Sequence, residues 1–82
     1  MYNIYDIDGC AYECTISKEK ISYADTLVGT ADSLAAAYTI AARYLFDCQQ
    51  AIDYAYDREY YVEHGYPKFN EKEYYSAINV VE

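Results

Sequence analysis

The stretch IYDIDGCAYECTI, residues 4–16, carries two alternating apolar and polar runs on either side of Asp8-Gly9. Alternation with a period of two is typical of half-buried β-strands. Asp-Gly supplies the positive backbone φ that a tight two-residue hairpin turn needs. The stretch therefore predicts an N-terminal β-hairpin that turns at Asp8-Gly9.

The residues Asp6-Ile7-Asp8-Gly9 also resemble the nucleophile motif of haloacid-dehalogenase-type phosphatases and the opening of a calcium loop. Those phosphatases need further acids, a Ser or Thr and a Lys on a doubly wound parallel sheet, which 82 residues with one substantial helix do not build. A calcium loop would put Ile4 at its first ligand position and Thr15 at its bidentate Glu. We interpret the motif as a turn and expect neither metal nor catalysis there.

One long helix is expected after the hairpin. From Ala31 to His64 the sequence has neither Gly nor Pro and is rich in Ala, with Thr30 or Asp32 available as the N-cap. Apolar side chains at helical spacing predict the buried face. These side chains are Leu34, Tyr38, Ala41, Leu45, Ile52 and Tyr56.

The same helical register continues to Glu59 and Glu63, where burial of a carboxylate is unfavourable. We therefore expect the helix to bend or stop between Asp57 and Tyr61. His64 near the helix end is interpreted as a favourable end charge.

The remaining elements are shorter. Residues 21–28 predict a third strand that ends at Gly29. Asn70 with Glu73 predicts the cap of a short helix, and residues 74–81 alternatively form a closing strand, which their β-branched end favours. The expected fold class is α+β: a single domain, residues 1–82, with a small antiparallel sheet packed on one long helix.

The cysteines do not indicate a metal centre or a disulfide scaffold. Cys10, Cys14, Cys48 and His64 lack the paired two-residue spacing of structural zinc sites. Burial of small side chains explains the three cysteines, so we expect reduced thiols, no metal and no cofactor. The N-terminus has no signal-peptide pattern and no apolar run spans a membrane, which predicts a cytoplasmic protein.

Acidity and tyrosine content bound the classes of partner. The net charge is −8 and 13 of the 82 residues are Tyr. A strongly negative field repels nucleic acid and anionic membranes and attracts basic protein surfaces. Tyrosine is enriched in protein contact surfaces because its ring is apolar and its hydroxyl is polar. We therefore expect a protein partner and no direct nucleic-acid binding.

The segment DCQQAIDYAYDREYY, residues 47–61, concentrates these residue types on a helix. Asp53 and Asp57 stand one helical turn apart, about 6 Å along the axis, which costs stability and matches the spacing of successive phosphates. The alternative is an ordinary solvated helix face with acids that serve solubility. The candidate partner-binding residues are Asp47, Asp53, Tyr54, Asp57, Tyr61 and Glu63.

With the acids and tyrosines of residues 47–63 and 66–75, this short chain resembles in composition the phage-encoded anti-CRISPR and anti-restriction proteins. Those families share no sequence signature, so no residue role is carried over. The resemblance implies a DNA-mimicking, non-enzymatic inhibitor that binds a basic, nucleic-acid-handling protein in the bacterial cytoplasm. The alternative is a small regulatory adaptor that forms a homodimer through its Tyr-rich face.

Overall fold

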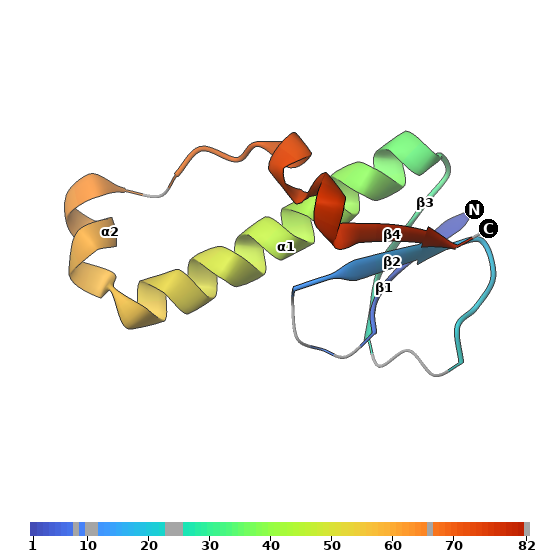
Figure 1. Cartoon of the computed structure of the whole chain (residues 1–82), viewed down its shortest axis with the longest axis horizontal. Coiled ribbons are helices and arrows are strands. Elements are labelled where there is room, and N and C mark those ends of the chain that lie inside the picture. Colours follow the sequence, from blue (N-terminus) through green and yellow to red (C-terminus); the bar gives the residue numbers. More distant parts are fainter. Residues whose placement is uncertain (8, 10–11, 23–25, 66, 82) are drawn as a thin grey trace.

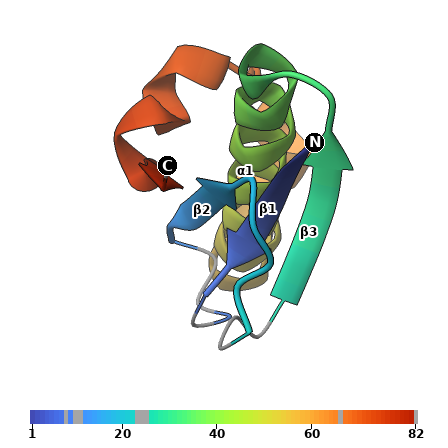
Figure 2. The same ribbon diagram turned by 90° about the vertical axis from the view of Figure 1, so that its right-hand side faces the viewer.

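The computed structural model describes residues 1–7, 9, 12–22, 26–65 and 67–81. It has an α+β fold in which a four-stranded mixed sheet packs against one long helix (Figures 1 and 2). The strand order is β3-β1-β2-β4. The elements are β1 (Tyr2–Asp6), β2 (Cys14–Ser17), β3 (Thr26–Ala31), α1 (Leu34–Tyr56), α2 (Arg58–His64), the 3₁₀ helix η1 (Glu71–Ala77) and β4 (Ile78–Val81).

The predicted hairpin pairing of β1 with β2 is confirmed, but the tight turn is wrong. A turn at Asp8-Gly9 would pair Ile4 with Glu13, whereas Ile4 pairs with Ile16. Residues paired across two strands share one face of the sheet, so the predicted register would carry an acid into the core. The observed register instead joins two fully buried isoleucines. Gly9 has a φ of 63°, a backbone conformation that favours glycine, while Asp8 lies outside the described residues.

The third strand lies further along the chain than predicted. β3 contains Gly29 and pairs antiparallel with β1. A Cβ atom at Gly29 would lie 3.4 Å from the Ile40 side chain, which is van der Waals contact, so β3 packs directly against α1 at this residue. Thr30 pairs with Asn3 in the sheet and cannot cap the helix. The cap is Ser33, whose hydroxyl accepts the Ala36 N–H at 3.1 Å.

Small side chains bring α1 close to the sheet. Ala37, Ala41 and Ala42 are fully buried on the helix face that meets the sheet. They form one cluster with the strand residues Ile4, Cys14, Ile16, Ala31 and Ile78 and with Leu45. A residue with a larger side chain at these alanines would have to displace the strands.

Only the first part of α1 covers the sheet. The 23 residues of α1 span about 34 Å, whereas the longest strand, with six residues, spans about 20 Å. Figure 1 shows α1 extending past the sheet and carrying α2 at its far end. Contrary to the prediction, the apolar face of α1 is therefore not buried along its whole length, because Ile52 is half-buried and Tyr56 is 89% exposed. The predicted break is confirmed, because α1 ends at Tyr56 and α2 begins at Arg58.

The C-terminal segment contains both of the structures that the sequence left open. Asn70 caps η1 by accepting the Lys72 N–H at 3.2 Å, and β4 follows directly. β4 runs parallel to β2, so the sheet is mixed and not purely antiparallel. In the segment between α2 and η1, the Phe69 ring packs on Phe46 of α1 with ring centroids 5.1 Å apart.

The outer face of the sheet, opposite α1, is crossed by the chain that follows β2 (Figure 2). The Ile21 N–H donates to the Tyr5 hydroxyl at 3.3 Å, and Tyr5 is 6% exposed. Within the described ranges, no helix combines the length and the apolar content needed to cross a membrane.

Candidate functional site

The structure gathers four of the six candidate residues at the break between α1 and α2. Asp53, Asp57 and Tyr61 line a hollow of about 290 Å³ together with Tyr56 and Tyr60, and we call these five residues the junction notch. Tyr54 is not part of the lining, but its ring centroid lies 6.3 Å from that of Tyr61. The notch stands at the end of the molecule that projects beyond the sheet (Figure 1).

The other two candidates lie outside the junction notch. Asp47 sits earlier on α1 and forms an ion pair with Arg43 at 3.1 Å, both side chains being more than half exposed. Such exposed pairs contribute little to stability. Glu63 is exposed on α2 and does not line the notch.

Asp57 makes the break between the two helices. Its N–H donates to the Asp53 carbonyl at 2.9 Å, which closes α1, and its carboxylate accepts the Tyr60 N–H at 3.3 Å, which caps α2. Asp is one of the preferred N-cap residues, and its negative charge is favourable beside a helix N-terminus. Asp57 therefore stabilises the local fold as well as presenting an acid at the surface.

Asp53 also stabilises the junction. It accepts hydrogen bonds from the Gln49 amide at 2.8 Å and from the Tyr61 hydroxyl at 3.3 Å. The second bond ties α1 to α2. Burial raises the pKa of Tyr61, and the neighbouring Asp53 carboxylate raises it further. The sequence argument that Asp53 beside Asp57 is only costly is wrong, because each acid accepts hydrogen bonds that the chain needs there.

Aromatic rings surround the two acids. The Tyr60 ring meets the Tyr61 ring edge-on at 5.5 Å and stacks on His64 at 4.5 Å. His64 also lies 3.1 Å from the Tyr60 carbonyl through Nδ1, so its imidazole closes α2. The guanidinium of Arg58 lies 6.0 Å from the centroid of Tyr54. Ring faces beside carboxylates suit cations, and Arg58 shows that a guanidinium reaches one of these faces.

Sequence reasoning missed two residues of the junction notch. Helical spacing places Tyr56 on the predicted buried face of the long helix, and Tyr60 is not among the predicted partner-binding residues. Tyr60 is 52% exposed and Val62, on α2, is 73% exposed. The relative lengths of the elements could have revealed their exposure. A helix of 23 residues is longer than the strands of a short hairpin, so its end must project beyond the sheet.

The motif at residues 6–9 does not present a carboxyl to solvent at Asp6. Asp6 is fully buried, and its Oδ2 accepts a 2.6 Å hydrogen bond from the Tyr44 hydroxyl. This bond, burial and the nearby Cys48 raise the pKa of Tyr44 above its ordinary value. The hydrogen bond joins the end of β1 to α1, so Asp6 has a structural role in the fold.

The possible zinc ligands are not brought together in the described part of the chain. Cys14 is buried in β2, whereas His64 belongs to α2 at the other end of the molecule (Figure 1). Cys48 is half-buried on α1 beside Tyr44, and Cys10 lies outside the described residues. No group of three or more His, Cys, Asp or Glu side chains with metal-binding spacing occurs among the residues whose positions are given.

No family model matches the sequence, and no curated protein or solved structure is significantly similar to it. The candidate site therefore stands on its own geometry. That geometry provides exposed tyrosine rings and two carboxylates around one hollow.

Proposed function

We propose that this chain is a non-enzymatic binding protein that inhibits a basic, nucleic-acid-handling protein of bacterial defence, such as a CRISPR-Cas or restriction component. The observation that carries the proposal is the junction notch, in which Asp53 and Asp57 stand among three tyrosines at the projecting end of the molecule. In this proposal the notch occupies part of the surface where the partner holds nucleic acid, in the bacterial cytoplasm.

The chemistry of the notch supports a cationic partner. A nucleic-acid-binding groove is lined with Arg and Lys side chains that neutralise phosphates. Asp53 and Asp57 offer charge to the same cations, and the rings of Tyr56 and Tyr60 offer faces on which a guanidinium stacks. The net charge of −8 strengthens attraction to a basic surface over a longer range.

The exposure of apolar surface at this end supports binding over simple solubility. Tyr56, Tyr60 and Val62 are 89%, 52% and 73% exposed. Acids that served only solubility would require no exposed rings beside them. Exposed aromatic residues with a rim of charge are instead typical of protein contact surfaces.

The adaptor that pairs with itself through the same tyrosines is the second candidate, favoured by the same exposed rings. Its electrostatics oppose it, because two copies that each carry a net charge of −8 repel one another. Sedimentation analysis separates the two candidates, since the inhibitor is monomeric until its partner is added and the adaptor is a dimer alone.

The test begins with affinity capture of the partner from a bacterial lysate, followed by association kinetics with the purified partner. Asp53→Asn combined with Asp57→Ser removes two charges while keeping hydrogen-bonding side chains at both positions. We expect slower association and a weaker dependence on salt, because surface charges act mainly on the association rate. The control is Glu13→Gln with Glu19→Gln, which removes two exposed charges beside β2.

Two results of this experiment would contradict the proposed role of the junction notch. Association of the double variant at the wild-type rate in low salt contradicts a role for the notch. Equal slowing by the control shows that total charge, and not the notch, attracts the partner.

A further inference from the structure

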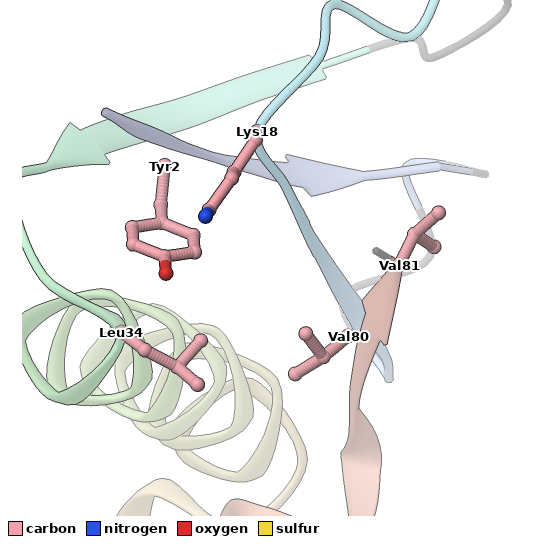
Figure 3. A pocket seen from close by; sticks show the side chains of 5 residues that line it. All are labelled: Tyr2, Lys18, Leu34, Val80 and Val81. Carbon is pink, nitrogen blue, oxygen red and sulfur yellow. The ribbon is translucent and has the colours of Figure 1, made fainter.

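A second hollow lies at the opposite end of the molecule, where α1 begins beside the sheet. It has a volume of about 390 Å³ and is lined by Tyr2 of β1, Lys18 just after β2, Leu34 at the start of α1, and Val80 and Val81 of β4. We call it the β4 recess. Its residues come from four separate parts of the chain, so the recess exists only in the folded protein (Figure 3).

The walls of the β4 recess are largely apolar. Figure 3 shows Val80 directed toward Leu34 and Tyr2, with the Tyr2 hydroxyl at the edge of the space between them. None of the described residues that line the recess is acidic. In a chain with 14 acids and six Lys and Arg, an apolar hollow with one cation is an unusual composition.

Lys18 supplies the polar end of the β4 recess. Its amino nitrogen lies 5.3 Å from the centroid of the Tyr2 ring, and this contact keeps the ammonium beside the ring in the lining of the hollow (Figure 3). The Tyr2 hydroxyl is a second hydrogen-bond donor in the same lining. Apolar walls with a small number of convergent polar groups, at this volume, are typical of small-molecule sites.

We infer that the β4 recess binds a small molecule that carries one carboxylate on a short aliphatic body. The aliphatic part packs on Leu34 and Val80, and the carboxylate accepts from the Lys18 ammonium. A singly charged anion is favoured over a phosphate, because Lys18 is the one cation among the described residues that line the recess and it balances one negative charge. The field of a chain with net charge −8 opposes a doubly charged anion more strongly.

This inference is independent of the proposed function. The β4 recess and the junction notch share no lining residue. A ligand in the recess contacts β4 and the start of α1, whereas the notch lies at the end of α1. Failure at one site therefore leaves the other unaffected.

The test is a methyl NMR titration of the full chain with three probes of equal length: hexanoate, hexanamide and hexylammonium. We expect hexanoate to shift the methyl signals of Leu34, Val80 and Val81 at lower concentration than hexanamide, and hexylammonium to shift them least. Lys18→Gln should weaken hexanoate binding about tenfold, which corresponds to one charge-assisted hydrogen bond, and leave hexanamide unchanged. Lys20→Gln, an exposed neighbour outside the lining, should change neither affinity.

Two results overturn the inference. Equal affinity for hexanoate and hexanamide in the wild-type protein removes the role of the carboxylate. Shifts spread over the whole molecule, or no shift at the three named residues, remove the site. Because Lys18 is exposed, its replacement leaves the fold intact, and the amide spectrum of the variant verifies this.

Discussion

The hydroxyl of Tyr44 donates a 2.6 Å hydrogen bond to the carboxyl of Asp6, which has no exposed surface. Asp6 is the first acid of the motif that resembles a phosphatase nucleophile or a calcium ligand. Its position at the end of β1, under α1, gives it a different role: it fixes the helix against the sheet where the core cluster ends.

Tyr44→Phe should destabilise the fold by about 2 kcal/mol, because a buried carboxyl loses a hydrogen-bond donor while the ring remains in place. Urea unfolding followed by circular dichroism measures the change. The matched control is Tyr56→Phe, which removes a hydroxyl from a side chain that is 89% exposed. A stability equal to wild type in Tyr44→Phe would show that the Asp6 carboxyl is satisfied without this bond.

The same bond predicts a dependence on alkaline pH. The hydrogen bond to Asp6 and burial raise the pKa of Tyr44 above 10.0, so the folded protein holds the phenol proton more tightly than the unfolded chain does. This contribution is present below pH 10 and is lost as the pH rises toward the folded-state pKa. We expect the free energy of unfolding to fall less steeply above pH 10 in Tyr44→Phe than in wild type. Parallel slopes for the two proteins in the alkaline range would contradict it.

Asp57→Ala and Asp57→Ser should differ in stability although both remove the charge. Alanine deletes the acceptor of the Tyr60 N–H and should cost about 1 kcal/mol, whereas serine keeps an N-cap and should cost less than half of that. Thermal unfolding of both variants under one buffer condition gives the comparison. If both lose stability equally, the charge of Asp57, and not its cap, is what holds α2.

Ala41→Leu should be strongly destabilising, by about 1 to 3 kcal/mol, because Ala41 is fully buried where α1 meets the sheet and the extra volume forces the layers apart. Ala35→Leu, on the exposed side of the same helix, is the matched control and should change stability little. Denaturant midpoints of the two variants measure the difference. Similar midpoints would mean that the helix and sheet are not closely packed at Ala41.

Tyr56→Ala should leave folding unchanged, because this side chain is 89% exposed. Under the proposed function it should speed dissociation from the captured partner by an amount equivalent to up to about 2 kcal/mol if the ring is a hot spot. Buried aromatic anchors act mainly on the dissociation rate, which surface plasmon resonance records directly. An unchanged dissociation rate would place the partner's contact away from the junction notch.

The fold class was predictable because two signals are local. Alternation around residues 4–16 predicted paired strands, and an Ala-rich run without Gly or Pro predicted the long helix. The turn was wrong because the Asp8-Gly9 signal competed with the core. Pairing Ile4 with Ile16 buries both residues, and this tertiary gain outweighs the local preference for the shortest turn.

The candidate site was predictable in part. The concentration of acids and tyrosines in residues 47–61 predicted Asp53, Tyr54, Asp57 and Tyr61 as parts of one site, and the structure brings them together. Helical spacing did not reveal that Tyr56 is uncovered, because exposure of a helix depends on how far the sheet extends beneath it. Helical spacing also did not reveal that Asp57 is the N-cap of α2. An N-cap can be assigned only when the residue at which the helix begins is known. The parallel pairing of β4 with β2 is likewise a long-range choice without a local signal.

The projection of α1 beyond the sheet has a consequence for hydrogen exchange. Amides near Ala41 are held by the core cluster and should exchange only when the whole molecule unfolds. Amides from Ile52 to His64 are protected only by local helical hydrogen bonds and by the bonds at Asp53 and Asp57. They should therefore exchange through local unfolding of the end of α1 and of α2, without unfolding of the sheet. The end that carries the junction notch can then open and close many times while the sheet remains folded, and a bound partner would slow its exchange first.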